Sequence, residues 1–165
     1  IYAGIMIDTN NFITRAGVRT FEAAAFLRRS GADMTRVRKM LRDNIDSYKA
    51  RAEAVRTAEI YRGCFAIAKC PSEGLESPTV VGAQAANELL NIIGVKASFV
   101  LTDYRNTIYI SARSIDEINV QIVMERLGGG GHLNIAGAQL EHYSITEAKD
   151  VLKQTLQKML DEGDI

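Results

Sequence analysis

The sequence has no apolar run of about 18 or more residues, the length that a membrane-spanning helix needs, and no recognisable signal peptide. It also has no excess of either charge, because 20 basic residues balance 20 acidic ones. Proteins that coat long nucleic acid usually carry a basic excess. These absences argue against membrane contact by this chain and against long nucleic acid as its partner. They leave room for a small anion held by a few local groups.

Cysteine is scarce, with only Cys64 and Cys70 in the chain. If both lie on one strand, six residues at about 3.3 Å each separate them by roughly 20 Å. A disulfide needs Cα atoms within about 7 Å of each other, so these two thiols cannot pair. A reduced, cytosolic compartment is the simplest interpretation.

Histidine is equally scarce, and neither an Asp-x-Asp nor a His-x-x-His spacing occurs. Phosphoester cleavage by two divalent ions needs clustered Asp and His ligands, so this chain alone does not supply such a centre. Asp8 stands out because it ends an apolar stretch, where a carboxylate is costly unless it is paired or binds a cation. Capping of the following turn, with Thr9 and Asn10, is an equally good explanation of the local sequence.

The length of 165 residues suits one ordinary domain, or a small domain plus part of another. The fractions of 47% hydrophobic and 24% charged residues are typical of a soluble globular protein. Residues 1–8 predict a buried helix or strand. Because this apolar opening lacks a start methionine and a polar lead-in, we expect the chain to be a piece of a longer protein.

Three helices are expected next, over residues 20–30, 35–42 and about 46–60, the first of them capped by Thr20. The second and third are rich in Arg and Lys and only thinly apolar. We therefore expect them to bridge two domains, with basic faces that are solvated.

The second half predicts a small α/β domain in which helices back a four-stranded sheet. Proline after Ser77 marks one helix start, and Ser/Glu capping boxes at 114/117 and 144/147 mark two more. The expected strands are 64–69, 97–102, 107–111 and 138–143, and the expected helices are 77–93, 115–127 and 145–159.

Between the last two strands stands the most informative stretch, Gly128–His132, with four glycines followed by a histidine. Glycine allows positive φ and close approach to a ligand, and consecutive backbone N–H groups in such a loop can bind an anion such as phosphate. A flexible linker is the alternative. The apolar flanks, which include Leu127 and Leu133, favour the anion-binding loop.

Arg113 lies where a predicted strand gives way to a capped helix, close in sequence to Ser111. A guanidinium group suits a bidentate phosphate contact, whereas a solvent-facing arginine is the alternative role. A strand end, a helix start and a glycine loop in one small domain favour convergence on an anion.

These residues together resemble the DHH/DHHA1 phosphoesterase superfamily. Ser111–Ser114, Gly128–His132 and Ala136–Ala138 are similar to the motifs of the DHHA1 substrate-binding domain. Gly4–Thr9, with Phe12, resembles the last metal-binding motif of a DHH domain.

The first helical segment narrows the resemblance. Arg19–Ala24, Leu27–Arg28 and Gly31–Asp33 are similar to cyclic-di-AMP phosphodiesterases of the GdpP type. The resemblance implies a C-terminal remnant of a DHH domain, a helical linker and a DHHA1 domain, at residues 1–33, 34–60 and 61–165.

The resemblance further implies that the intact bacterial protein is membrane-anchored, with this part in the cytoplasm, and hydrolyses cyclic di-AMP to pApA with two Mn²⁺ ions. Asp8 would be one metal ligand. The residues that would hold a phosphate of the dinucleotide are Ser111, Arg113, Gly128, Gly129, Gly130, Gly131 and His132.

This sequence departs from the family in lacking the Asp-His-His motif and the earlier metal ligands, so the chain alone is expected to be inactive. Two other functions stay open: a nanoRNase-like or RecJ-like enzyme for short oligonucleotides, and a non-catalytic module for nucleic-acid binding or dimerisation. Arg19–Ala24 counts against the first alternative, and zero net charge together with Asp8 counts against the second. Because related domains often dimerise, a homodimer is a further expectation.

Overall fold

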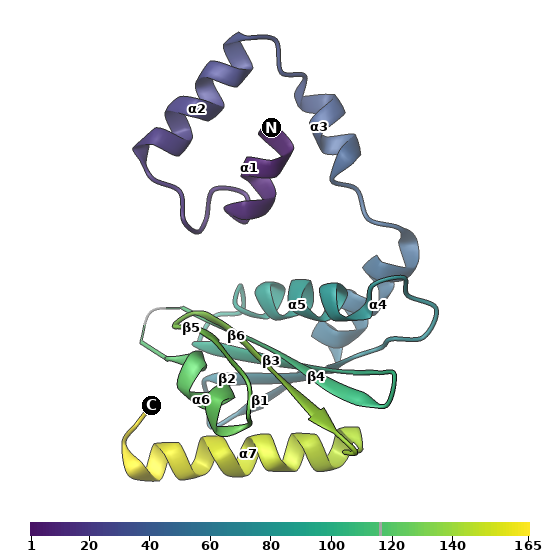
Figure 1. Cartoon of the computed structure of the whole chain (residues 1–165), viewed down its shortest axis with the longest axis vertical. Helices are drawn as coiled ribbons and strands as arrows, with labels where there is room; N and C mark the ends of the chain where they lie inside the picture. The colour runs from purple at the N-terminus through teal and green to yellow at the C-terminus, as the bar shows by residue number, and fades with distance from the viewer. Residues whose placement is uncertain (116) are drawn as a thin grey trace. The chain divides into compact units, whose positions relative to one another are not determined.

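The computed structural model describes residues 1–115 and 117–165 (Figure 1). These residues form two compact units, Ile1–Asn44 and Ile45–Ile165. The first unit is helical, and the second holds a sheet with helices on both of its faces.

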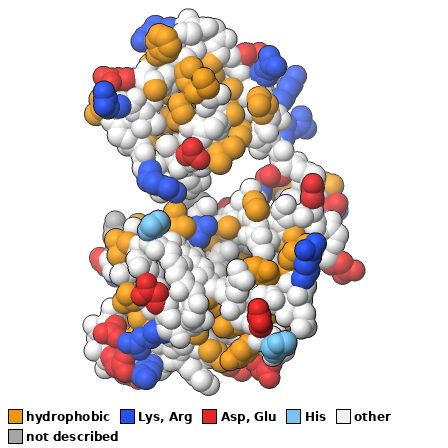
Figure 2. All heavy atoms as spheres, in the orientation of Figure 1, with side chains coloured by type: hydrophobic (Ala, Val, Ile, Leu, Met, Phe, Trp, Pro, Cys, Tyr) orange, Lys and Arg blue, Asp and Glu red, His pale blue; other side chains and the backbone are white. Residues whose placement is uncertain are grey.

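The first unit contains α1 (Tyr2–Asp8), α2 (Val18–Arg29) and α3 (Met34–Met40). The opening apolar stretch is thus a helix, but the expectation that it is buried is wrong, because α1 has no buried residue. Several large apolar side chains of this unit are exposed, as the orange patches over it in Figure 2 show; they include Ile7, Ile13, Val18, Phe21 and Phe26.

The start of α2 differs from the sequence prediction. The helix begins at Val18, and the Gly17 N–H donates a hydrogen bond to Thr20 Oγ1 over 3.3 Å. Thr20 therefore lies inside the first turn instead of at the cap.

The second unit is built on a mixed sheet, which confirms the predicted α/β class. The sheet has six strands instead of the expected four, in the order β1-β2-β3-β4-β6-β5. The pair β2–β3 is parallel, and every other neighbouring pair is antiparallel. The strands are β1 (Glu59–Tyr61), β2 (Phe65–Cys70), β3 (Ala97–Tyr104), β4 (Thr107–Ser114), β5 (Gly130–His132) and β6 (Ile135–Glu141).

Helices cover the two faces of the sheet unequally. One face packs against α6 (Val120–Arg126) and α7 (Ile145–Glu162), as Figure 1 shows. This larger core includes Phe65, Phe99, Leu101, Ile108, Ile110, Met124, Leu152 and Leu156. The other face carries α4 (Ile45–Arg56) and α5 (Pro78–Leu89), which pack into a second core with β2 and β3.

The second face is therefore left open over β4, β6 and β5. Along β4, buried side chains alternate with half-buried ones, and the half-buried ones are Thr107, Tyr109, Ser111 and Arg113. We call the α5 side of β4, β6 and β5 the open face. It consists of Tyr109, Ser111, Arg113, Gly130, His132, Ile135, Gly137 and Gln139.

Helix caps in this unit were predicted with mixed success. The Ser144 cap of α7 is confirmed, because Ser144 Oγ accepts from the Glu147 N–H and Glu147 Oε2 accepts from the Ser144 N–H. The cap at Ser114 is wrong: Ser114 ends β4 and is buried, and α6 starts at Val120 with Asn119 as its cap. Position 116, inside the predicted helix, lies outside the described residues.

Candidate functional site

The glycine run is divided between a helix end and a strand. The Gly128 N–H donates to Glu125 O over 3.0 Å, and the Gly129 N–H donates to Met124 O over 2.8 Å. With φ of +78° at Gly128, this is a Schellman motif that ends α6. The first two amides of the run are thus engaged by carbonyls, so these two N–H groups are not free to donate to an anion in this conformation.

The rest of the run, Gly130–His132, is the edge strand β5, which pairs with β6. A Cβ at Gly131, where φ is +148°, would lie 2.5 Å from Ala136 Cα. A Cβ at Gly129 would lie 2.1 Å from Gly137 O. Carbon atoms normally approach to about 3.5–4.0 Å, so glycine at 129 and 131 is needed for close backbone packing.

Gly130 differs from both neighbours. A Cβ built there would meet nothing within 4 Å, and its φ is not positive. Since Gly130 pairs with Gly137, and Gly137 pairs with Ser111, a side chain at 130 would project onto the open face. Steric crowding by the protein therefore does not explain this glycine.

The strand register arranges the open face in three rows, because directly paired residues project to the same side of a sheet. The first row is Tyr109–Gln139, the second is Ser111–Gly137–Gly130, and the third is Arg113–Ile135–His132. Successive rows are two residues apart along the strands, or about 7 Å. The predicted residues Ser111, Arg113, Gly130 and His132 are thus brought to one face.

A cavity of about 460 Å³ lies on this face, beside the first turn of α5. Its size is within the usual range for small-ligand sites, roughly 300–1,000 Å³. It is lined by Thr79, Tyr109, Ile110, Ser111, Gly128, Gly129, Gly130, Gly137, Ala138 and Gln139. Arg113 and His132 lie in the adjoining row and do not line the cavity itself.

Arg113 is the main electrostatic feature of the site. It is half-buried, and Nη1 donates to Ala112 O over 2.8 Å. Burial lowers the pKa of the guanidinium, but arginine remains charged at neutral pH. No carboxylate among residues 1–115 and 117–165 forms an ion pair with it, whereas Arg126 pairs with Glu162 over 2.7 Å. A half-buried cation that has no carboxylate partner among these described residues favours an anionic ligand.

The turn between β5 and β6 is tied to the end of β4. Asn134 Nδ2 donates to Ser114 Oγ over 3.1 Å, and the Ser114 N–H donates to Asn134 O over 3.1 Å. These bonds fix the hairpin that carries His132 beside the strand end that carries Arg113. No local sequence pattern indicated this connection, because the two partners are 20 residues apart.

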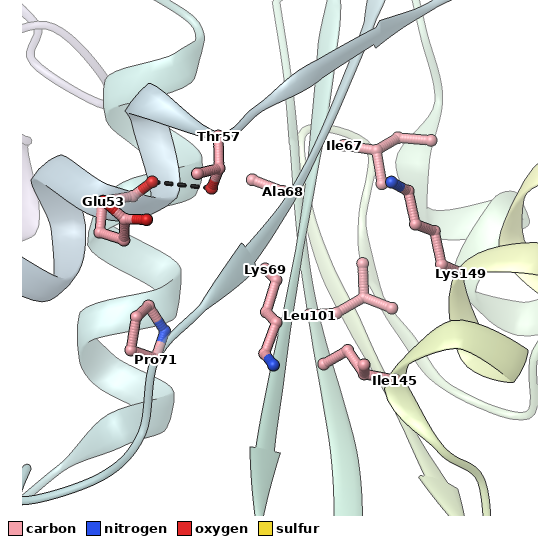
Figure 3. A pocket seen from close by; sticks show the side chains of 9 residues that line it. All are labelled: Glu53, Thr57, Ile67, Ala68, Lys69, Pro71, Leu101, Ile145 and Lys149. Carbon is pink, nitrogen blue, oxygen red and sulfur yellow. Dashed lines mark hydrogen bonds between the residues drawn. The ribbon is translucent and has the colours of Figure 1, made fainter.

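A second cavity, of about 360 Å³, lies at the edge of β2 between α4 and α7 (Figure 3). Its charged side chains include Glu53, which pairs with Arg56 over 2.7 Å, and Lys149, which pairs with Glu59 over 2.7 Å. These two charges are already compensated within the protein, and the third charged side chain of the lining, Lys69, is exposed, so its ammonium group is solvated. The open face is therefore the better candidate for binding an anion.

Asp8 lies in the first unit, at the exposed C-terminal end of α1. The turn after it is held by Thr9, whose hydroxyl donates to Ile5 O over 2.6 Å and accepts from the Phe12 N–H over 3.0 Å. In the described part of the chain, no three His, Cys, Asp or Glu residues are grouped so that they could hold a metal ion. These residues alone therefore do not fit a two-metal centre.

No helix within residues 1–115 and 117–165 combines the length and the apolar character needed to cross a membrane.

Comparison with known proteins places the chain in a family. Residues 63–159 match the DHHA1 domain. Over 165 residues the chain is 43% identical to the cyclic-di-AMP phosphodiesterase GdpP of Bacillus subtilis, a match that covers 99% of this chain and 25% of the relative. Over 153 residues it is 46% identical to the cyclic-di-AMP phosphodiesterase PdeA of Listeria monocytogenes, covering 92% of this chain and 23% of the relative.

The fold is also similar to the crystal structure of an exopolyphosphatase-related protein from Bacteroides fragilis. The TM-score is 0.81 at 22% sequence identity, and the match covers 94% of this chain and 48% of the other. The chain spans about a quarter of the length of the curated relatives. Because the DHHA1 match extends over more than half of its residues, the chain belongs to the DHHA1 domain family.

Proposed function

We propose that the intact protein hydrolyses cyclic di-AMP to pApA, and that the unit Ile45–Ile165 binds the dinucleotide. The observation that carries this proposal is Arg113, a half-buried guanidinium on the same face as Ser111 and His132. The names of the relatives, cyclic-di-AMP phosphodiesterases over 92% or more of this chain, support the choice of substrate.

In this proposal four residues of the open face have a role in binding the phosphate. Arg113 makes a charge-assisted contact with one phosphate, and His132 donates a further hydrogen bond to it. Ser111 donates its hydroxyl to the same ligand. Gly130 leaves the floor of the cavity open, so that the ligand can approach the backbone. Together these groups would neutralise the phosphate and fix its orientation.

Catalysis is proposed to need residues outside this chain. Two Mn²⁺ ions would supply an activated water and neutralise the scissile phosphate, with Asp8 as one of their ligands. The described residues hold no cluster for such ions, so we expect the purified chain to be inactive. Turnover of cyclic di-AMP by the chain alone with Mn²⁺ would contradict this part.

A cytoplasmic location for this part of a membrane-anchored parent is likewise a proposal. It is supported by Cys64 and Cys70, which are free thiols. Burial raises the pKa of Cys70 to about 11, so this thiol is unreactive at neutral pH.

The binding role is tested by calorimetric titration of the chain with pApA and cyclic di-AMP. Arg113→Ala should lose a charge-assisted contact of about 1.5–3 kcal/mol, which weakens affinity roughly tenfold to more than a hundredfold. Arg62→Ala is the matched control, because Arg62 is an exposed arginine in the turn between β1 and β2, at the opposite edge of the sheet. If both variants bind like the wild type, the open face is not the phosphate site.

A further inference from the structure

The first row of the open face has no role in the phosphate contact described above. Tyr109 on β4 and Gln139 on β6 are directly paired, and both line the cavity. Tyr109 is half-buried and Gln139 is exposed. The Tyr109 ring centroid lies 6.5 Å from that of Tyr104, and the Arg105 guanidinium lies over the Tyr104 ring. One wall of the cavity is therefore aromatic, next to an uncharged amide.

We infer that Tyr109 and Gln139 form the nucleobase subsite of this protein, with Tyr109 stacking on the base and Gln139 reading its edge. The inference rests on the proposed function, because it assigns the base of the same ligand whose phosphate contacts Arg113. It names adenine as the preferred base, from the chemistry of the Gln139 side chain.

The spacing of the rows matches the order of groups in a nucleotide. The base row and the phosphate row, with Arg113 and His132, lie on either side of a central row. Each step between rows is about 7 Å. The central row consists of Ser111, Gly137 and Gly130, whose small side chains leave room for a ribose. A nucleotide bound along β4 would thus place its ribose against the smallest side chains of the open face.

Stacking on Tyr109 has a physical basis in the position of this half-buried residue at the cavity. Tyr61 of this unit is engaged within the protein, because its OH contacts Gln157 Oε1 over 3.4 Å and Lys153 lies over its ring. The Tyr109 ring is tilted by 48° against the Tyr104 ring, and the residue lines the cavity. Stacking of a base on an aromatic side chain is worth about 1–3 kcal/mol, enough to orient a weakly held nucleotide.

The Gln139 amide supplies the base preference. It offers one acceptor oxygen and an NH₂ donor, which complement the N6 donor and the N7 acceptor on the major-groove edge of adenine. Guanine presents two acceptors, N7 and O6, on that edge, so the amide oxygen would face an acceptor and a bidentate contact is lost. The inferred preference for adenine therefore applies to a base that Gln139 contacts on its major-groove edge. Within residues 1–115 and 117–165 no hydrogen bond to the Gln139 side chain is formed, which leaves both of its groups available.

The test compares ligands that differ only in the base. The dissociation constants of 5′-AMP, 5′-GMP and ribose 5-phosphate are measured for the wild type, Tyr109→Ala, Tyr109→Phe and Arg113→Ala. We expect Tyr109→Ala to weaken AMP binding by roughly fivefold to a hundredfold and to leave ribose 5-phosphate unchanged. Tyr109→Phe should keep AMP affinity within about twofold, because the stacking surface is preserved.

Arg113→Ala separates the two proposals. It should weaken AMP, GMP and ribose 5-phosphate alike, since all three carry the phosphate. If Arg113→Ala weakens binding but Tyr109→Ala does not, the base subsite is overturned while the phosphate site stands. If the wild type binds none of the three ligands, both proposals fall.

Gln139→Glu is a second variant at an exposed position, where misfolding is not expected. A carboxylate has acceptors only, so it loses adenine but can accept from the N1–H and N2–H₂ groups of guanine. Its negative charge weakens the binding of every phosphate-containing ligand, so the ratio of AMP to GMP affinity is the informative quantity. We expect that ratio to fall at least fivefold. An unchanged ratio would show that Gln139 does not contact the base.

Discussion

Alanine at two neighbouring glycines, Gly130 and Gly131, should separate binding from folding. At Gly130, a new methyl group meets no protein atom within 4 Å and enters the cavity. We therefore expect the free energy of unfolding of Gly130→Ala to stay within about 0.5 kcal/mol of the wild type. At Gly131, the methyl group would lie 2.5 Å from Ala136 Cα and 2.5 Å from Ile135 O.

The cost at Gly131 has two parts. Its φ of +148° is almost exclusive to glycine, and a side chain there costs on the order of 1–3 kcal/mol. Relief of the clash requires β5 to move away from β6, which adds roughly 1–3 kcal/mol, as overpacking does. Because β5 is a three-residue edge strand, its local detachment from β6 limits the total loss of stability. We expect a loss of about 2–5 kcal/mol, or roughly 6–20 °C in Tm.

Two assays on the same samples separate the effects. Thermal unfolding and hydrogen exchange of β6 amides report stability, and titration with pApA reports binding. Gly130→Ala should unfold like the wild type but bind roughly tenfold to a hundredfold more weakly, because the methyl group blocks a ligand contact worth about 1.5–3 kcal/mol. Gly131→Ala should lose both stability and β6 protection. The reasoning is refuted if Gly131→Ala is as stable as the wild type, or if Gly130→Ala binds pApA normally.

Three stability predictions can be checked by denaturant unfolding. Thr102→Val should stabilise the protein by about 1 kcal/mol, because Thr102 Oγ1 is buried and has no hydrogen-bond partner among the residues that the structure describes; a loss of stability would refute this. Ser144→Ala should lose about 1 kcal/mol with the α7 cap, and Ser144→Asp should retain most of it. Lys149 and Lys153 lower the pKa of Glu59 in the folded protein. Their stabilisation of the fold is therefore complete above the unfolded-state pKa of about 4.3 and is lost as the pH falls through the lower folded-state pKa. Glu59→Gln should remove this acid dependence at a cost below about 1 kcal/mol, since the carboxylate is exposed; an unchanged pH profile would contradict it.

Local sequence patterns were sufficient where the residues of an element define it without partners that are distant in the sequence. The α7 helix follows from its Ser144 cap and its apolar spacing, and β2 follows from a continuous apolar run. The hairpin β3–β4 was expected, but the strands are longer than predicted. Arg105 and Asn106 adopt positive φ of 51° and 62° and close the turn in only two residues.

Other features depend on partners that are distant in the sequence, so local sequence patterns could not predict them. The strand β5 consists mostly of glycine, so its sequence shows no alternation of apolar and polar side chains. It forms because β6 pairs with it. The Ser114–Glu117 pattern looks like a helix cap, yet Ser114 bonds the β5–β6 turn, and Glu117 pairs with Lys96 over 2.7 Å. The strand β1 has three residues, too few to interrupt a helical pattern.

The candidate site shows the same division. Motif similarity pointed to Ser111, Arg113 and the glycine run, but not to the mechanism by which each glycine acts. Tyr109 and Gln139 were missed, because in sequence they are ordinary outward residues of alternating strands. Only the register of β4 against β6 places them in the same cavity.

The parallel pairing of β2 and β3 has a consequence for how this cavity receives its ligand. Parallel neighbours need a crossover, and α5 is that crossover, anchored further where Ser98 Oγ donates to Ala86 O over 2.6 Å. A helix tethered at both ends and hydrogen-bonded near its C-terminal end is held against the sheet. We therefore expect ligands to enter and leave past α5 without a lid movement, and we expect a longer 71–77 connection to alter which ligands fit without slowing their exchange.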